Sequence, residues 1–576
     1  MRIALVYPPP WKIPELGEAP DTWGDGPPKG FKPTDIDADF FQMPYGMFTL
    51  GAAALQAGHQ VKVVNLSAFP WPRVEQALEA LDADVYGMSC YTANRRGVAI
   101  VAKAIKRLRP RAHVIVGGPH VTALPKETLS FVEAIDSVAM GEGEATFLEL
   151  LERLSEQRTL DGMSGLAYRS NGSIVVGPRR DRIRELDSLP SPHRHYRTHL
   201  FMTSRGCPGE CTFCAKNTTW GRIYRTHSVD YVLDGLEAAL SRLPVKMILV
   251  KDDTFTADRK RAIRICEGIR ERKINFLWSC DTRADVLNED VLRAMRLAGC
   301  QRLSFGVESA SPKILRNIRK KMKPQEVLHA TKIAKKFGMQ VRYFMMLGNR
   351  GETAATFKES LDFVRAAQPH QALFACLSIY PGTNDFQVME RNGWIDREVY
   401  FTDDFQELKV PFDASERDTQ LMSDWFDQNM GIRYLHQPTV EECKTVLGEL
   451  GELHTAHLDL AGAYYREGAL DDAEVHVNRA LELDYPAPGL AYNYLACIAA
   501  DRGDYEAMQE CFNQAAVDPQ HPVLVRNVQV ARKWVREGGQ ASGAPLSLAA
   551  RHDFELLERT EQPTLPGPLE PDFSNW

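Results

Sequence analysis

Short apolar runs alternate with amphipathic segments along most of this chain, and this alternation restricts its fold more than any other feature. In the first 160 residues, the apolar runs lie at 3–7, 58–64, 84–89, 113–118 and 137–140. Helical patterns separate them, at 49–57, 71–81 and 97–108. Strands that alternate with helices build parallel sheets with helices on both faces. Residues 1–160 are therefore predicted to form a doubly wound parallel sheet.

A second alternating series occupies residues 196–410. Its candidate strands are 199–204, 245–250, 276–280, 301–307, 340–347 and 372–379. Parallel barrels carry their active sites at the carboxyl ends of their strands, so polar residues that follow these runs are candidates for ligand binding. Between the two series, residues 161–195 are predicted to be a linker that contains a pair of strands.

The last third of the chain has a helical pattern with an internal repeat. The segments 460–470 and 495–505 are similar and recur with a period of about 34–35 residues, the period of tetratricopeptide (TPR) helix pairs. We expect a helical connection at 411–452, TPR-like repeats at 453–537, and a poorly ordered tail at 538–576 that is rich in Gly, Pro and acid. The repeats either bind a protein partner on a concave face or serve as a buttress without a ligand.

Composition excludes several classes of function. A net charge of −7 over 576 residues provides no general basic field, so we expect no nucleic-acid partner. No apolar run approaches the about 18 residues that cross a bilayer, and the N-terminus has the pattern of a strand rather than a secretion signal. The 11 cysteines do not form a disulfide framework, which favours a reducing cytoplasm.

Three cysteines stand close together after the strand 199–204, as Cys207, Cys211 and Cys214 with the spacing C-x3-C-x2-C. Three thiolates on one loop can hold three irons of a [4Fe–4S] cluster and leave the fourth iron open. A zinc site with His227 as fourth ligand is one alternative, because structural zinc takes four protein ligands. Chance spacing is the other.

This loop, with Phe213 directly before the third cysteine, resembles the radical S-adenosylmethionine (SAM) family. The resemblance implies that 196–410 folds as a partial (β/α)6 barrel with SAM bound over the strand ends. The SAM contacts it implies are Phe213, Asp252, Asp253, Glu308, Ser309 and Arg342. Asp252 and Asp253 stand where many relatives have a Gly-Gly-Glu motif. A salt-bridge network that closes the barrel is the alternative for Asp252, Asp253, Arg283 and Arg342.

The loops after the first series of strands are Pro8–Pro10, 89–92, 117–120 and 141–144, and two of them are rich in glycine. Glycine lets the backbone approach a large flat ligand, although each loop alone also suits a tight turn. Ahead of the cysteine motif, the set resembles the Rossmann-like cobalamin-binding domain of cobalamin-dependent radical SAM enzymes. The cobalamin contacts this implies are Ser89, Tyr91, Thr92, Gly117, Gly118, Pro119, Glu142 and Gly143. Because D-x-H-x-x-G is absent from the sequence, the cobalt is expected to lack a protein histidine below it.

The resemblance covers about residues 1–410 and implies a methyltransferase. In this chemistry a 5′-deoxyadenosyl radical removes hydrogen from an unactivated carbon, which then receives a methyl group by way of methylcobalamin. One alternative is a cyclase or rearrangement enzyme, like the anaerobic porphyrin cyclase, that transfers no methyl group. Another is a non-catalytic cobalamin or TPR sensor. A low-potential electron donor such as flavodoxin or ferredoxin is implied, whereas the sequence does not identify the small-molecule or peptide substrate, a catalytic residue or the oligomeric state.

Overall fold

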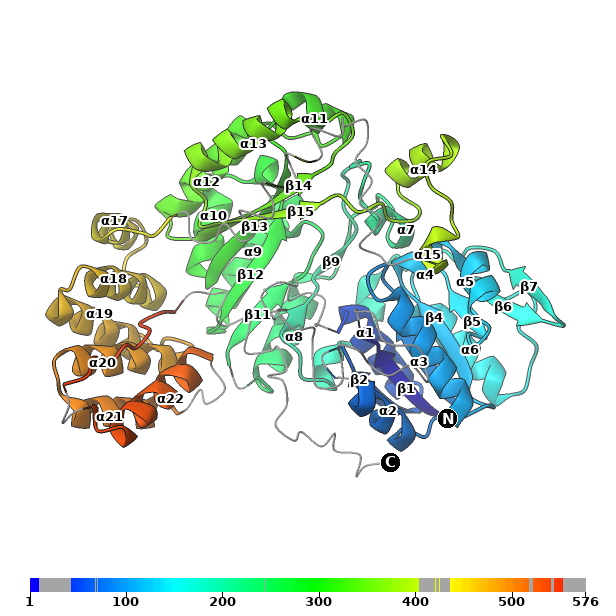
Figure 1. Cartoon of the computed structure of the whole chain (residues 1–576), viewed down its shortest axis with the longest axis horizontal. Coiled ribbons are helices and arrows are strands. Elements are labelled where there is room, and N and C mark those ends of the chain that lie inside the picture. The colour runs from blue at the N-terminus through cyan, green and yellow to red at the C-terminus, as the bar shows by residue number, and fades with distance from the viewer. Residues whose placement is uncertain are drawn as a thin grey trace.

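The computed structural model describes residues 1–9, 43–67, 69, 71–243, 245–402, 420, 424, 436–516, 522–539 and 543–552. Figure 1 shows two sheets beside each other and a helical region beyond the second sheet. The predicted mixed α/β chain with an all-α C-terminal region is confirmed. The expectations for Pro10, for most of the connection before residue 436, and for 553–576 lie outside the described residues.

The first sheet has seven strands in the order β2-β1-β3-β4-β5-β6-β7. Ile3 and Leu5 pack on one of its faces and Ala4 and Val6 on the other, which explains the continuously apolar run. The parallel strands are β1 (Arg2–Tyr7), β2 (Gln60–Asn65), β3 (Val85–Ser89), β4 (His113–Gly117) and β5 (Ser137–Ala139). The helices are α1 (Tyr45–Gln56), α2 (Trp71–Ala80), α3 (Arg95–Leu108), α4 (Pro119–Ala123), α5 (Pro125–Phe131) and α6 (Glu144–Ser155).

The strand pair predicted within 161–195 extends this first sheet. β6 (Leu166–Ser170) pairs antiparallel with β5, and β7 (Ser173–Val176) pairs antiparallel with β6. The rest of that segment holds two short 3₁₀ turns, Leu186–Ser188 and Pro192–Arg194.

The order of the first sheet reverses at β1, which has β2 on one side and β3 on the other. Ligands of such sheets bind beyond the carboxyl ends of the strands at this reversal. Here the loops after β3 and β4 touch, because a Cβ on Gly118 would lie 2.6 Å from the Cys90 carbonyl oxygen. Gly118 also has φ of +110°, so both space and backbone conformation require glycine.

The second sheet has six parallel strands in the order β15-β14-β13-β12-β11-β8. The order follows the sequence and the edge strands β8 and β15 do not pair with each other, as expected for a partial barrel. Its strands are β8 (Leu200–Phe201), β11 (Met247–Val250), β12 (Leu277–Thr282), β13 (Cys300–Glu308), β14 (Gln340–Leu347) and β15 (Gln371–Cys376). A short antiparallel pair, β9 (Ser204–Arg205) and β10 (Arg225–Thr226), flanks the cysteine loop.

Helices cover the outer face of the second sheet, where Ile248, Leu303 and Val341 share one core with helical side chains. The main helices are α8 (Val229–Leu240), α9 (Arg259–Glu271), α10 (Glu289–Leu297), α12 (Pro324–Lys336) and α13 (Ala354–Ala367). Shorter ones are α7 (Lys216–Thr219), α11 (Pro312–Asn317), α14 (Asn384–Arg391), α15 (Val399–Thr402) and the 3₁₀ turns Phe255–Ala257 and Ala284–Val286.

Part of the C-terminal helical region packs against the inner face of the second sheet, at the amino-terminal end of its strands. The helices of this region are α17 (Val440–Leu450), α18 (His454–Arg466), α19 (Leu470–Glu482), α20 (Pro488–Asp501), α21 (Tyr505–Ala515) and α22 (Pro522–Arg536). Leu458 of α18 and Leu490 of α20 share an apolar core with Leu200, Met247 and Leu277, which begin or nearly begin their strands. The amino-terminal end of the sheet is therefore covered by the C-terminal third of the chain. Across the described residues, no helix combines the length and apolar character that crossing a bilayer requires.

The prediction of a poorly ordered tail is wrong for residues 543–552. This stretch is an extended segment, and the backbone of Ala549 is hydrogen-bonded to the side chains of Asn493 and Asn527. Leu546 and Leu548 also pack into an apolar cluster with residues of α20, α21 and α22. The prediction relied on the Gly and Pro content of the segment, and composition does not reveal partners such as Asn493 and Asn527 on helices distant in sequence.

Candidate functional site

The carboxyl ends of the two sheets meet beside the cysteine loop. Gly382, which follows β15, fits between Thr218 of α7 and Ala123 of α4, because a Cβ there would lie 2.5 Å and 3.0 Å from their side chains. Phe213 of the cysteine loop and Leu124 belong to one apolar cluster. The loops expected to bind two different cofactors are thus neighbours.

Two of the three cysteines, Cys207 and Cys211, lie next to Gly209. A Cβ on Gly209 would be 3.3 Å from the Cys207 Sγ and 4.0 Å from the Cys211 Sγ, and the Gly209 N–H donates to Cys207 Sγ at 3.4 Å. Cys207, Cys211 and Cys214 are all half-buried and reduced. This crowding around a glycine, with thiols that remain partly accessible, fits a cluster bound over the loop.

Two residues between the cysteines anchor the loop from below. The Thr212 hydroxyl donates to Asp385 Oδ2 at 2.8 Å, and its N–H donates to the Ile318 carbonyl at 3.0 Å. Phe213 packs against Ile314, Leu315 and Ile318, so it supports the loop from within the fold. Thr212 was not among the predicted residues, since a threonine between cysteines has no distinctive pattern.

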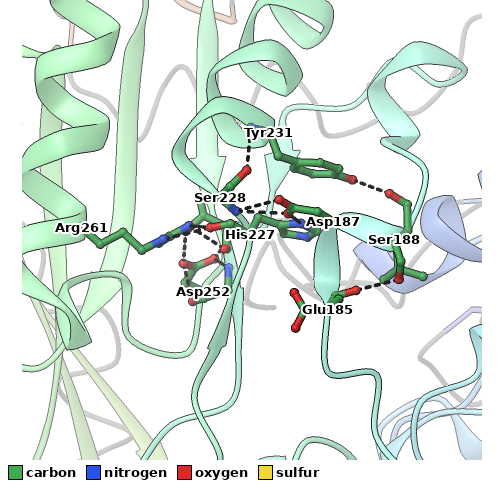
Figure 2. A network of polar contacts seen from close by, with 11 residues as sticks. Glu185, Asp187, Ser188, His227, Ser228, Tyr231, Asp252 and Arg261 are labelled. Carbon is green, nitrogen blue, oxygen red and sulfur yellow. Dashed lines mark hydrogen bonds and ion pairs between the residues drawn. The ribbon is translucent and has the colours of Figure 1, made fainter.

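The zinc interpretation finds no support in this geometry. Within the described part of the chain, no three His, Cys, Asp or Glu side chains gather closely enough to hold a single metal ion. Figure 2 shows His227 turned toward Asp187, with Nδ1 and Oδ1 2.9 Å apart, and its ring stacks on Tyr231. A cluster of four irons spaces its thiolates more widely than one zinc ion, whose sulfur ligands lie about 2.3 Å from the metal.

Positive side chains flank the cysteine loop. Burial raises the pKa of Cys211, and Lys320 and Arg283 act in the opposite direction. Because thiolates rather than thiols bind iron, these cations favour the ligating form. Arg283 is ion-paired with Asp285 at 2.7 Å, and Lys320 is ion-paired with Glu308 at 2.9 Å. Lys320 was missed from the sequence, since it lies 12 residues beyond its partner with no recognisable motif.

Asp252 and Asp253 have different surroundings. The Asp252 carboxylate is 1% exposed and accepts four hydrogen bonds, from the N–H and hydroxyl groups of Thr203 and Ser204 at 2.5–3.1 Å. Arg261 donates to Thr203 beside it (Figure 2). Asp252 therefore braces the strand that leads into the cysteine loop, and its predicted role as a SAM contact is wrong.

Asp253 is the carboxylate that remains available. Its Oδ1 lies 2.7 Å from the Lys216 ammonium, two residues past the last cysteine. Its Oδ2 is buried and has no hydrogen-bond partner among the described residues. A buried carboxylate oxygen without a donor is an energetic cost that a bound cation relieves, so Asp253 fits the ammonium of SAM.

Of the predicted SAM contacts Glu308, Ser309 and Arg342, the geometry supports only Glu308. Glu308 ends β13 with φ of +66°, an uncommon conformation that directs its side chain to Lys320 near the cysteine loop. Ser309 is buried, and its hydroxyl contacts Ser360 Oγ and accepts from the Ser311 N–H, so the predicted side-chain contact with SAM is not supported. Arg342 pairs with Gln371, the first residue of β15, and lies well below the strand ends. Its predicted SAM contact is therefore wrong in this geometry.

The predicted cobalamin residues mostly line one edge of the first sheet. Ser89 and Gly117 are paired at the ends of β3 and β4, and Pro119 begins α4. Tyr91 is 39% exposed, and a Cβ on Gly141 would meet nothing within 4 Å. An exposed ring after β3 and open glycine backbone after β5 leave room for a large flat ligand beyond the carboxyl ends of the strands.

Two members of this set contact neighbouring side chains of the fold. The Thr92 hydroxyl lies 3.1 Å from Nδ1 of His120, and both side chains are buried. Burial lowers the pKa of His120 to about 3, so this histidine is neutral. Gly143 precedes α6, where a Cβ would lie 3.5 Å from Leu50. Thr92 and Gly143 therefore shape the loops from behind.

Glu142 does not face the open edge, and its predicted cobalamin contact is wrong. Its carboxylate is buried and accepts from Arg205 at 3.0 Å, from Arg225 at 2.9 Å and from the Ile183 N–H at 2.8 Å. Glu144 pairs with Arg205 at 2.5 Å. We call Glu142, Glu144, Arg205 and Arg225 the ion cluster. It joins the loop after β5 to the strand pair that flanks the cysteines.

Comparisons with known proteins agree with this division. The family model "B12 binding domain" matches residues 36–151, and "Radical SAM superfamily" matches residues 201–364. The chain is 35% identical over 353 residues to "Uncharacterized methyltransferase PH0819" of Pyrococcus horikoshii, covering 59% of this chain and 77% of that protein.

A second relative and one solved structure extend this similarity. The anaerobic magnesium-protoporphyrin IX monomethyl ester cyclase of Rubrivivax gelatinosus is 26% identical over 358 residues, covering 58% of this chain and 64% of that protein. The structure of the cobalamin-dependent SAM radical enzyme OxsB with aqua-cobalamin bound is similar in fold, with a TM-score of 0.59 and 16% identity, over 97% of this chain and 83% of that one.

Proposed function

Because the chain belongs to the cobalamin-dependent radical SAM enzymes, we propose that it is a methyltransferase that delivers a methyl group from SAM, by way of cobalamin, to an unactivated carbon. The observation that carries this proposal is the meeting of the cysteine loop with the strand ends of the first sheet. Two cofactors bound there would face one shared space, as a methyl transfer between them and a substrate requires.

The residues divide the work as follows. Cys207, Cys211 and Cys214 would hold the cluster, and Asp253 would accept a hydrogen bond from the SAM ammonium through its unpaired oxygen. Glu308, which pairs with Lys320 near the cysteine loop, would also contact SAM. When bound, the cluster supplies the electron that cleaves SAM and cobalamin carries the methyl group, while the protein orients the reactants and excludes water.

Replacing all three cysteines by alanine tests the first step. The variant is expected to lose the iron–sulfur absorbance near ~400 nm and all formation of 5′-deoxyadenosine. Cys511→Ala, a change on the remote helix α21, is the matched control and is expected to keep both. Retention of both signals by the triple variant would overturn the cluster assignment.

Cyclisation or rearrangement without methyl transfer is the second candidate, favoured by the relative that is named as a cyclase. Mass spectrometry of the product separates the two, because methylation adds about 14 Da and cyclisation does not. We further propose a cytoplasmic location. We also propose a low-potential electron donor such as flavodoxin or ferredoxin, and reconstitution of activity with each donor would test this second proposal.

A further inference from the structure

The C-terminal helices form a face that already holds an extended peptide. Residues 543–552, drawn in red in Figure 1, run from α22 across α20 to α18. The last residues of this segment, 550–552, line a cavity of about 370 Å³ together with residues of the second sheet, α17 and α18. The segment is thus a separate stretch of chain laid over a surface of packed helices.

Two buried asparagines bind the backbone at the centre of this segment. The Ala549 carbonyl accepts from Asn493 Nδ2 at 2.9 Å and from Asn527 Nδ2 at 3.0 Å, and the Ala549 N–H donates to Asn527 Oδ1 at 3.0 Å. Asn527 also donates to Asn493 Oδ1 at 2.7 Å. The two asparagines are 34 residues apart, about one repeat length, so successive repeats place them side by side. These contacts recognise the peptide group rather than a particular side chain.

Side chains on either side of the asparagine pair fix the register. Leu546 and Leu548 enter an apolar cluster that includes Ala496, Met508 and Ala531. At the far end, His552 bridges two helices, with Nδ1 at 2.8 Å from the Tyr494 hydroxyl and Nε2 at 2.9 Å from Asp459. The face therefore selects two leucines, a small residue and a histidine in an extended chain.

The asparagine pair is matched to a peptide group. Asn493 and Asn527 are 0% and 1% exposed while the segment covers them, and without it the amides that contact Ala549 would hydrogen-bond to water or to another backbone. A helical buttress needs only apolar packing at such positions. Two buried amides that point at one peptide group are instead typical of a surface that binds extended backbone.

We propose that α18, α20 and α22 form a peptide-binding groove and that residues 543–552 are its internal ligand. When this segment leaves, the groove accepts an extended peptide of the same chemistry in trans. The proposal concerns the helical region alone and does not depend on methyl transfer.

The test uses the full chain and a fluorescein-labelled peptide with the sequence of residues 543–552. Ala549→Pro removes the N–H that donates to Asn527 and releases the segment while leaving the groove intact. We expect this variant to bind the peptide at least ten-fold more tightly than the unaltered chain by fluorescence anisotropy. Adding Asn527→Ala to it should abolish binding, and adding Asn513→Ala, an exposed change on α21, should not.

Two outcomes overturn the proposal. Failure of the folded Ala549→Pro chain to bind the peptide excludes the groove, and equal binding by the unaltered chain excludes the internal ligand. Far-UV circular dichroism and thermal melting establish that each variant is folded. If Ala549→Pro does not fold, the chain ending at Gly539 enters the same comparison, and its failure to bind has the same meaning.

Discussion

Substitution of Glu142 by glutamine should weaken the contact between the two sheets and lower the free energy of unfolding. The Glu142 carboxylate accepts from two arginines and a backbone N–H, all within 3.0 Å. An amide in its place carries no charge and presents an NH2 group to donors. Arg225, whose side chain is 9% exposed, would then lie buried next to a neutral group, whereas Arg205 would keep its ion pair with Glu144.

The size of the effect follows from burial. Breaking a buried ion pair by altering one partner costs about 3–5 kcal/mol, because a charge stays buried without compensation. Glu152 on α6, the helix that follows Glu142, is the matched control, since it pairs with Arg158 at 2.8 Å and the two side chains are 60% and 49% exposed. An exposed pair of this kind is worth about 0–1 kcal/mol, so Glu152→Gln should change little.

Urea unfolding measures the difference. Far-UV circular dichroism follows the whole chain, and tryptophan fluorescence reports on the nine tryptophans, among them Trp220, whose ring lies 4.8 Å from the Arg205 guanidinium. A chain with several structural units does not unfold in two states, so the free energy of unfolding is taken from the first transition. If Glu142→Gln shifts that transition no more than Glu152→Gln does, the ion cluster does not hold the sheets together and the reasoning fails.

Three further predictions concern individual residues. Asp252→Asn should lower the free energy of unfolding by about 1–3 kcal/mol, because an amide cannot accept all four hydrogen bonds. Asp253→Asn should instead leave the melting temperature unchanged and weaken SAM binding about ten-fold, as measured by calorimetry. Gly118→Ala should destabilise the first sheet by about 1–3 kcal/mol, since its Cβ would meet Cys90 at positive φ; an unchanged melting temperature would contradict this. Burial lowers the pKa of His193 to about 3, so only the unfolded chain takes up a proton below about pH 6.5 and stability falls as pH falls toward 3. His193→Phe should therefore flatten the slope of unfolding free energy against pH between 7 and 5, and an unaltered slope would refute the assignment.

The strands and the cysteine loop could be predicted from local pattern. Runs such as 3–7 and 340–347 are apolar enough, and spaced regularly enough, to fix parallel strands without knowledge of their neighbours. The spacing of Cys207, Cys211 and Cys214 is equally local. The polar contacts were harder, because successive residues at a strand end point in different directions. Asp252 turns into the fold and Asp253 toward Lys216, and nothing in an Asp-Asp pair distinguishes them.

Long-range partners account for the remaining errors. Glu142 was assigned to cobalamin by its place in a glycine-rich loop, but its arginine partners lie 63 and 83 residues further on. Residues 543–552 were assigned to a disordered tail by composition, although Asn527 and Asn493 lie 22 and 56 residues before Ala549. Local sequence and composition do not reveal these partners, because each partner is distant in the sequence and is brought close only by the fold.

The packing of α18 and α20 on the inner face of the second sheet limits how this protein can be dissected. A chain cut after residue 410 would keep Cys207, Cys211 and Cys214 and every strand of the barrel. It would nonetheless expose Leu200, Met247 and Leu277 to water, where they would favour aggregation. The smallest fragment able to fold is therefore longer than the smallest fragment that carries the chemistry, and expression trials should retain the helices through α20.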